Sequence, residues 1–89
     1  MAIANIYQSL EQGIRVFDSS IAGLGGCPYA KGASGNVSTE DLYYLLSNMG
    51  YDTGIDLDAL MIASQNISQV LQRTNPSNYA NAYWQKRCA

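Results

Sequence analysis

Apolar residues near the amino end of the chain recur at the spacing of one helical face. They are Ile3, Ile6, Tyr7 and Leu10. This period predicts an amphipathic helix over residues 2–12, which Gly13 ends. No capping residue precedes this helix, so we expect further residues upstream in the natural protein.

The next stretch changes to the composition of a β-strand. Residues 14–21 read IRVFDSSI, are rich in β-branched side chains and are too short for a typical helix. They predict a strand with Ile14 and Val16 on one face. A loop over residues 22–36 follows, and residues 22–35 contain five glycines and one proline. Connections of this length without regular structure are uncommon unless they serve a function.

Two further helices are predicted after the loop. Ser38 is a suitable N-cap for a helix over residues 38–49, and acidic residues follow it where the helix dipole favours negative charge. A third helix is expected over residues 57–73, with its start signal at Asp56. The apolar stripes of these helices are Leu42, Leu45, Leu46 and Met49 in the first, and Leu57, Leu60, Ile67, Val70 and Leu71 in the second.

The number and order of these elements predict the fold class. A single strand cannot form a sheet, because the N–H and C=O groups along its edges need partners. Helix, strand, long loop and helix is the βα order of a parallel sheet. We therefore expect an α/β fold, with residues 1–89 forming the C-terminal βα portion, about a third, of a (β/α)8 TIM barrel that is mostly helical when taken alone. The tail is expected to add one short helix around residues 79–84.

Charge and composition exclude several classes of function. The formal net charge is −2 and charged residues make up 13% of the chain, against about 25% in a typical domain. Clustered cations that could displace phosphate counterions are missing, so no nucleic-acid partner is expected. Neither a long apolar run nor a signal-peptide pattern is present, so we expect no membrane-spanning helix and place the protein inside the cell.

The absence of His narrows the chemistry further. Without the commonest general base and transition-metal ligand, a metal site here would depend on oxygen ligands or on residues supplied from elsewhere. Two cysteines, Cys27 and Cys88, do not make a disulfide framework of the secreted kind. Cys88 near the chain end is either an idle thiol or one half of an intermolecular disulfide.

The loop over residues 22–36 is the candidate active site, because barrel enzymes carry their chemistry in the loops that follow the strands. Gly23, Gly25 and Gly26 allow positive φ angles or a close approach of the backbone to a ligand. A thiol near a cation or a metal loses its proton well below its usual pKa of about 8.5, so Cys27 is a candidate acid–base group, delivered by closure of the loop. The alternative is a small buried cysteine without a catalytic role.

A longer segment carries a family resemblance. The run from Asp18 to Tyr29, DSSIAGLGGCPY, resembles the signature of 3-hydroxy-3-methylglutaryl-CoA lyases. The similarity continues through AKGASGNVSTEDL to Leu42, and AIAN at residues 2–5 resembles the helix that follows the His-x-His-Asp metal motif of these enzymes. It weakens after about Arg73. The glycine–cysteine segment is rarely seen elsewhere, which makes the resemblance specific.

The resemblance implies a reaction and a metal. These enzymes cleave 3-hydroxy-3-methylglutaryl-CoA to acetyl-CoA and acetoacetate by a retro-Claisen reaction, assisted by Mg²⁺ or Mn²⁺. By resemblance, Cys27 acts in proton transfer and Asn36 is a metal ligand through its amide oxygen, a donor that hard cations prefer. Taken alone, Asn36 is equally suited to a turn before the helix cap. Lys31 either meets the phosphates of the acyl-CoA substrate or is solvated.

Other parts implied by the resemblance are not encoded in residues 1–89. They are an aspartate and two histidines that complete the metal site, and an arginine that polarises the substrate. A single amide does not hold Mg²⁺ against water, so the chain is expected to be inactive by itself and to need the missing amino-terminal barrel portion or another subunit. A homodimer is expected for the parent enzyme, in either the cytoplasm or the mitochondrial matrix.

Two other functions stay open. One is a non-catalytic interaction module that exposes its apolar helix faces to a partner. The other is a related acyl-CoA lyase or synthase with a different substrate. Asp18 and Glu40 are candidate supporting residues: Asp18 orients groups at the barrel mouth or accepts backbone hydrogen bonds, and Glu40 supports the site or, with Asp41, serves as a capping charge.

Overall fold

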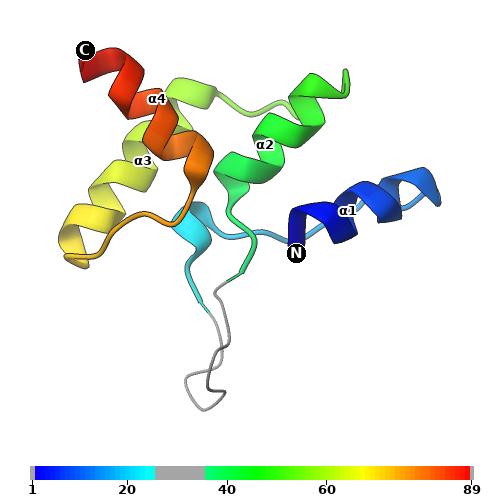
Figure 1. The fold of residues 1–89 in the computed structure, drawn as a ribbon, viewed down its shortest axis with the longest axis horizontal. Coiled ribbons are helices and arrows are strands. Elements are labelled where there is room, and N and C mark those ends of the chain that lie inside the picture. Colours follow the sequence, from blue (N-terminus) through cyan, green and yellow to red (C-terminus); the bar gives the residue numbers. More distant parts are fainter. Residues whose placement is uncertain (1, 26–35, 89) are drawn as a thin grey trace.

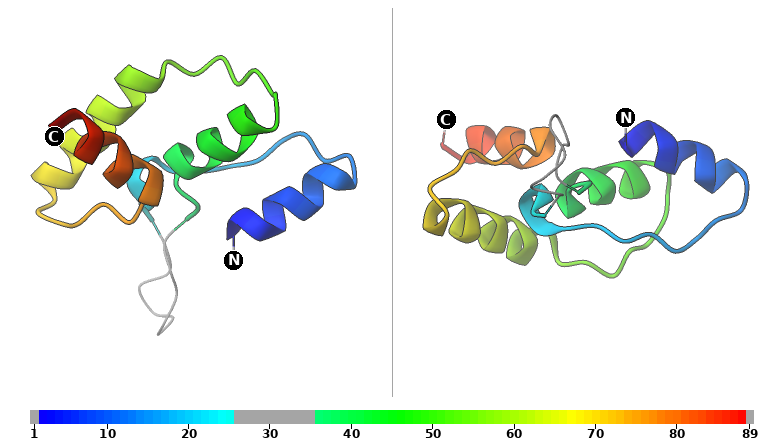
Figure 2. Two further views of the ribbon diagram at one scale, coloured as in Figure 1. Left: turned by 45° about the horizontal axis from the view of Figure 1, so that its top comes forward. Right: turned by 90° about the horizontal axis from the view of Figure 1, so that it is seen from below.

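The computed structural model describes residues 2–25 and 36–88, and these ranges form four α-helices and one 3₁₀ helix (Figure 1). In chain order they are α1 (Ala2–Glu11), η1 (Ile21–Gly23), α2 (Thr39–Asn48), α3 (Leu57–Val70) and α4 (Asn78–Cys88). Helices α2 and α3 contact η1, and α4 packs against both of these helices, whereas α1 lies beside α2 at one end (Figure 2). The molecule is flat, with extents of 38 × 36 × 19 Å.

Local sequence signals explain where the helices begin. The Ser38 hydroxyl accepts a hydrogen bond of 3.2 Å from the Asp41 N–H, and the Asp56 carboxylate accepts one of 3.2 Å from the Ala59 N–H. Both residues are therefore N-caps that satisfy a free donor of the first turn. This confirms the N-cap predicted at Ser38 and the helix start predicted at Asp56. Helix α4 extends well beyond the short helix expected around residues 79–84.

The strand expected over residues 14–21 is not formed. Residues 14–19 run without regular structure from α1 to η1, and Ile21 already belongs to η1. In the described ranges, ladder pairing is limited to one parallel bridge between Ser20 and Ser38. The reason is that no second strand within residues 2–25 and 36–88 lies beside the segment, so most of its backbone groups cannot form a ladder. The side chains predicted to share one face of the strand are open to solvent, with Ile14 50% and Val16 84% exposed.

The apolar core lies between α1 and α2. Ile6, Leu10 and Leu42 are buried against each other, and partly buried side chains surround them. The surrounding residues are Phe17, Val37, Leu45 and Leu46. This cluster uses the helical stripes that the sequence predicts for both helices.

A second buried centre surrounds η1 and is largely polar. Ala22, Met61 and Ala80 are fully buried there, together with Glu40, Ser64 and Ser77. A buried carboxylate and two buried hydroxyls must be hydrogen-bonded to be tolerated, so directed polar contacts decide how α2, α3 and α4 meet.

None of the helices in the described part of the chain is long and apolar enough to cross a membrane.

Candidate active site

The described residues include both ends of the predicted catalytic loop. Gly26, Cys27 and Lys31 lie outside the described residues, whereas Gly23, Gly25 and Asn36 lie within them. Asp18 is exposed and precedes the loop, and Glu40 lies in the first turn of α2.

Backbone hydrogen bonds join the two ends of the loop. The Ser20 N–H donates to the Val37 carbonyl at 3.0 Å, and the Thr39 N–H donates to the Ser20 carbonyl at 2.9 Å. The Ser19 and Thr39 hydroxyls share a further hydrogen bond of 2.8 Å. The parallel bridge therefore brings the start and the end of the loop together just before α2 begins.

Asn36 adds a side-chain link across the base of the loop. Its Nδ2 donates to the Leu24 carbonyl at 2.8 Å. Because only the amino group of the amide can donate to a carbonyl, this bond fixes which way the amide faces. No hydrogen bond from a described residue reaches Oδ1 of Asn36. An amide oxygen held in a set direction is a suitable donor for a hard cation.

Gly25 is needed for this arrangement of Asn36. Its φ is +96°, and a Cβ atom at this position would lie 2.5 Å from Nδ2 of Asn36. Any other residue would therefore strain the backbone and collide with the amide.

Glu40 connects the start of the loop to the body of the molecule. Its carboxylate is fully buried and accepts the Ala22 N–H at 3.0 Å and 3.2 Å on its two oxygens. The Ser64 hydroxyl donates to Oε2 at 2.6 Å, and Nδ2 of Asn75 lies 3.4 Å from the same oxygen. The carboxylate of Glu40 therefore points inward and is bonded to the backbone at the start of the loop.

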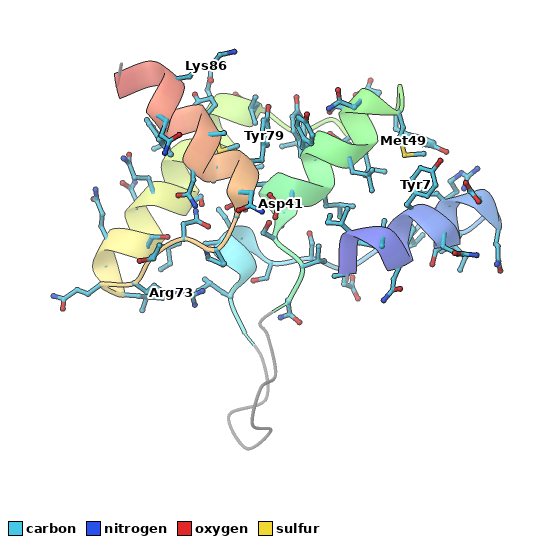
Figure 3. The ribbon with its side chains drawn as sticks, in the orientation of Figure 1. Tyr7, Asp41, Met49, Arg73, Tyr79 and Lys86 are labelled. Carbon is cyan, nitrogen blue, oxygen red and sulfur yellow. The ribbon has the colours of Figure 1, made fainter. Side chains whose placement is uncertain are left out.

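Ala22 has a backbone conformation that is unfavourable for a residue with a Cβ atom. Its φ is 53° and ψ is 22°, in the left-handed region, and the residue is completely buried. Such a conformation costs about 1–3 kcal/mol and persists only where surrounding contacts hold it. Here Glu40 accepts the Ala22 N–H, and Nη2 of Arg73 lies 3.4 Å from the Ala22 carbonyl. Figure 3 labels Arg73 near the end of α3.

The contributions of Ser64, Arg73 and Asn75 were not expected from the sequence. Arg73 and Asn75 follow α3 and carry no local signal of their own. Ser64 was missed because the predicted apolar stripe of α3 included Val70 and Leu71, which are exposed. The buried residues of this helix are instead Met61, Ser64 and Ser68, a face that only the packing of α3 reveals.

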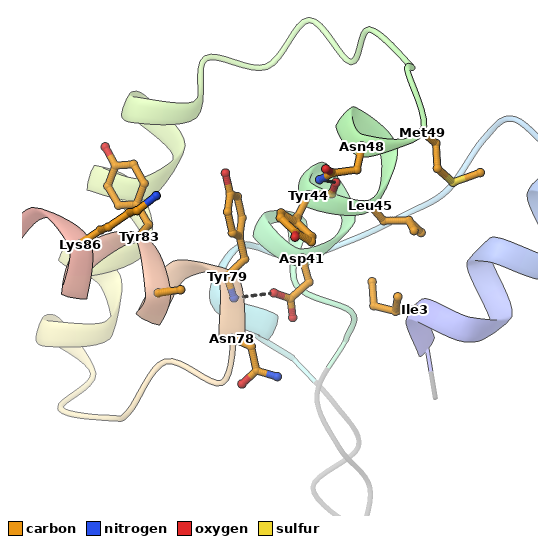
Figure 4. Close-up of a pocket in the computed structure, with 11 residues that line it drawn as sticks. Ile3, Asp41, Tyr44, Leu45, Asn48, Met49, Asn78, Tyr79, Tyr83 and Lys86 are labelled. Atoms are coloured by element: carbon orange, nitrogen blue, oxygen red, sulfur yellow. Dashed lines mark hydrogen bonds between the residues drawn. The ribbon is translucent and has the colours of Figure 1, made fainter.

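A separate groove of about 980 Å³ lies between α2 and α4 (Figure 4). Tyr44 and Tyr79 pack against each other in it, with ring centroids 4.6 Å apart, and Tyr79 stacks on Tyr43 at 6.4 Å. Burial, and then the neighbouring Tyr43 and Tyr44, raise the pKa of Tyr79. The described acid of this groove, Asp41, accepts hydrogen bonds from the Ser77 hydroxyl at 2.7 Å and the Tyr79 N–H at 3.1 Å. Asp41 and the tyrosines therefore hold the start of α4 against α2.

Nothing in the described ranges forms a complete metal site. No group of three or more His, Cys, Asp or Glu residues lies close enough there to hold a metal ion. Asn36 can supply one oxygen ligand, and the others would have to come from outside the described residues.

The sequence of the chain is similar to those of known proteins. A sequence model described as HMGL-like matches residues 1–67. The chain is 59% identical over 81 residues to the 3-hydroxy-3-isohexenylglutaryl-CoA/hydroxy-methylglutaryl-CoA lyase of Pseudomonas aeruginosa, which covers 91% of the chain and 27% of that relative. It is 52% identical over 81 residues to the cytoplasmic 3-hydroxy-3-methylglutaryl-CoA lyase of Homo sapiens, covering 91% of the chain and 22% of the relative.

Solved structures match the fold. The crystal structure of the hydroxymethylglutaryl-CoA lyase from Pseudomonas aeruginosa superposes with a TM-score of 0.89 at 57% identity, over 97% of the chain and 29% of that protein. An HMG-CoA lyase from Acinetobacter baumannii, solved in complex with coenzyme A and 3-methylmalate, matches with a TM-score of 0.84 at 44% identity, over 91% of the chain and 27% of that protein. These matches confirm the expected fold class, one part of a TIM barrel that is mostly helical when taken alone. The chain spans about a quarter of the length of these relatives.

Proposed function

The chain belongs to the HMGL-like family, and from this membership we propose that it is the loop-bearing part of a 3-hydroxy-3-methylglutaryl-CoA lyase. The parent enzyme would cleave 3-hydroxy-3-methylglutaryl-CoA to acetyl-CoA and acetoacetate. The observation that carries this proposal is the 59% identity to the Pseudomonas aeruginosa lyase over 91% of the chain. Because the chain covers 27% of that relative, we propose that residues 1–89 are inactive without the rest of the barrel.

The proposed reaction breaks one carbon–carbon bond. The tertiary hydroxyl of the substrate loses its proton and becomes the ketone of acetoacetate, while the bond to the thioester-bearing carbon breaks. The resulting enolate of acetyl-CoA takes up a proton at carbon. We assign Cys27 to proton transfer in this step, because its thiol follows the glycines of a loop whose ends are joined at the base.

Asn36 is the proposed metal ligand within this chain. Its Nδ2 is held by the Leu24 carbonyl at 2.8 Å, which leaves the amide oxygen for another partner. This donor fits Mg²⁺ or Mn²⁺, both of which take oxygen ligands. When bound, the metal would polarise the oxygens of the substrate as a Lewis acid. An aspartate and two histidines from the remaining barrel would complete the site.

Further assignments concern the substrate, the compartment and the assembly. We propose that Lys31 meets the phosphates of the acyl-CoA substrate, and that Gly23, Gly25 and Gly26 let the loop close over it. We place the parent enzyme inside the cell, since relatives include forms named cytoplasmic in rat and mitochondrial in Arabidopsis thaliana. A homodimer is proposed for the parent enzyme.

The test uses a hybrid lyase, in which residues 1–89 replace the matching segment of the Pseudomonas aeruginosa enzyme. The hybrid is expected to form acetoacetate from 3-hydroxy-3-methylglutaryl-CoA in the presence of Mg²⁺, while residues 1–89 alone form none. Cys27→Ser in the hybrid is expected to lower kcat by about 100-fold or more, the usual contribution of a positioned acid–base group.

The matched control is Cys88→Ser, which changes the other cysteine and should leave kcat unchanged. Thermal melting of each variant shows whether the fold is kept. A hybrid that melts like the Pseudomonas aeruginosa enzyme but cleaves nothing would reject the proposed function, and unchanged turnover in Cys27→Ser would remove this thiol from the mechanism.

A further inference from the structure

A continuous chain of hydrogen bonds runs from the segment after α3 to the start of the loop. Nδ2 of Asn75 donates to the Ser64 hydroxyl at 2.5 Å, and that hydroxyl donates to Oε2 of Glu40 at 2.6 Å. Glu40 then accepts the Ala22 N–H on both of its oxygens. Since Ser64 has a single hydrogen, accepting from Asn75 directs that hydrogen to the carboxylate.

Burial makes this network sensitive to the loss of any member. Glu40 and Ser64 are both fully buried. The hydrogen bonds that Glu40 accepts in the described part of the chain come from neutral groups: a backbone N–H, a hydroxyl and an amide. In a low-dielectric interior each of these donors matters, because a carboxylate that loses one must find another or move.

The start of the loop depends on where Glu40 lies. The Ala22 N–H is held by this carboxylate in a left-handed conformation, and the backbone then leads to Leu24, whose carbonyl accepts from Asn36. A shift of the Glu40 carboxylate would therefore move Ala22 and, two residues further on, the Leu24 carbonyl. The Asn36 amide that donates to this carbonyl would move with it.

The segment after α3 also touches the loop base directly. Nη2 of Arg73 lies 3.4 Å from the Ala22 carbonyl, and a Cβ atom on Gly23 would lie 3.1 Å from Cγ of Pro76. The side chain of Asn75 is itself oriented by the Ser77 N–H, which donates to Oδ1 at 2.9 Å. Residues 73–77 thus pack along η1. They lie beyond residues 1–67, the range matched by the family model.

We propose that Ser64 and Asn75 are positioning residues for the glycine–cysteine loop: through Glu40 they fix Ala22, and through Ala22 they fix the direction in which the loop leaves the body of the molecule. This inference rests on the proposed function. Ser64 is fully buried, and both residues reach the loop through the carboxylate of Glu40. They affect the lyase reaction indirectly, by fixing where the loop lies when the transition state forms.

The test compares two serines of α3 in the hybrid lyase. Ser64→Ala removes a hydroxyl that holds Glu40. Ser68 is only 9% exposed, and its hydroxyl has no hydrogen-bond partner in the described ranges, so Ser68→Ala removes a hydroxyl of the same helix without breaking a hydrogen bond. Ser64→Ala is expected to lower kcat by about tenfold with little change in KM, the signature of a contact that acts in the transition state. Ser68→Ala should change neither, and Ser64→Thr, which keeps a hydroxyl, should recover most of the turnover.

A second measurement does not depend on activity. Hydrogen exchange measured by mass spectrometry on peptides covering residues 20–25 should be faster in Ser64→Ala and in Asn75→Ala than in Ser68→Ala. Equal exchange and equal kcat in Ser64→Ala and Ser68→Ala would overturn the inference. If the unmodified hybrid melts like the Pseudomonas aeruginosa enzyme but is inactive, the proposed function fails, and the exchange rates still decide whether Ser64 and Asn75 position the loop base.

Discussion

At the scale of single residues, the base of the loop combines three backbone conformations that are rare for ordinary side chains. Ala22 has φ 53°, Gly23 has φ 65° and Gly25 has φ 96°. Ala22 is held by the hydrogen bonds of its N–H and C=O groups, and the two glycines adopt positive φ because they lack a Cβ atom. Strain of this kind is kept where a defined geometry is needed, which agrees with a functional loop.

Gly25→Ala tests whether Gly25 and Asn36 are coupled. In the hybrid lyase the substitution is expected to cost about 1 kcal/mol for the positive φ, plus the effect of a Cβ atom placed 2.5 Å from Nδ2 of Asn36. Displacement of the amide should weaken Mn²⁺ binding. Urea unfolding and Mn²⁺ titration by electron paramagnetic resonance measure the two effects.

Gly13→Ala is the matched control for Gly25→Ala. Gly13 has φ +93°, and a Cβ atom added there would have no described neighbour within 4 Å, so it shares the backbone penalty without the collision. If both substitutions cost the same and leave Mn²⁺ affinity equal, the contact between Gly25 and Asn36 has no role in metal binding.

Local sequence was a good guide to some residues and a poor one to others. Ser38 and Asp56 could be recognised as N-caps because a cap acts on a donor only a few residues away. Asn75 could not be recognised, since its partner Ser64 lies 11 positions earlier and Glu40 lies 35 positions earlier. Contacts at such separations depend on how the helices pack, which local patterns do not encode.

At the scale of elements, α2 connects the other parts of the molecule. Its first turn holds η1 through Glu40 and the start of α4 through Asp41, while Leu42 packs on α1. Its outer face carries Tyr43 and Tyr44, which contact Tyr79 of α4. The helix therefore joins the polar centre, the apolar cluster and the tyrosine contacts.

The contact between α2 and α4 should depend on pH. Burial and the two neighbouring tyrosines raise the pKa of Tyr79 in the folded chain, so the folded state holds this proton more tightly than an unfolded chain, whose tyrosine has a pKa of about 10. The stabilisation is complete below about pH 10 and is lost as the pH rises through the folded pKa. Urea unfolding between pH 8 and about 11 should show a smaller loss of stability in Tyr79→Phe than in the unchanged protein.

Tyr7→Phe is the comparison for this experiment, since Tyr7 is an exposed tyrosine of α1, outside the α2–α4 contact. A decline in stability for Tyr79→Phe as steep as in the unchanged protein would show that Tyr79 ionisation is not linked to folding.

At the scale of the whole molecule, the chain leaves large apolar side chains exposed. Val16 is 84% exposed and Val70 is 75% exposed, in a molecule only 19 Å thick. Exposed apolar surface of this kind usually marks a contact with other protein. Since the chain spans about a quarter of its relatives, we expect the remaining barrel to cover the segment around Val16.

Val16→Asp separates the isolated chain from the assembled enzyme. In residues 1–89 alone the substitution should leave the helix content measured by circular dichroism unchanged, because the side chain is 84% exposed. In the hybrid lyase it should lower the free energy of unfolding by about 3 kcal/mol or more, because a carboxylate would be buried without a partner. Equal stability of the Val16→Asp hybrid and the parent hybrid in urea would show that this segment does not join the barrel.

The sequence by itself determined α1, α2 and α3, the starts of α2 and α3, and the family, because helix period, capping and a contiguous motif are all properties of neighbouring residues. Tertiary structure alone decided that residues 14–19 form no strand and that Glu40, Ser64 and Asn75 hold Ala22. A strand exists only where another strand pairs with it, and a buried carboxylate is stable only where distant donors converge on it. The packing of the whole chain decides both conditions: it gives residues 14–19 no strand to pair with in the described ranges, and it brings the donors of Ala22 and Ser64 to Glu40.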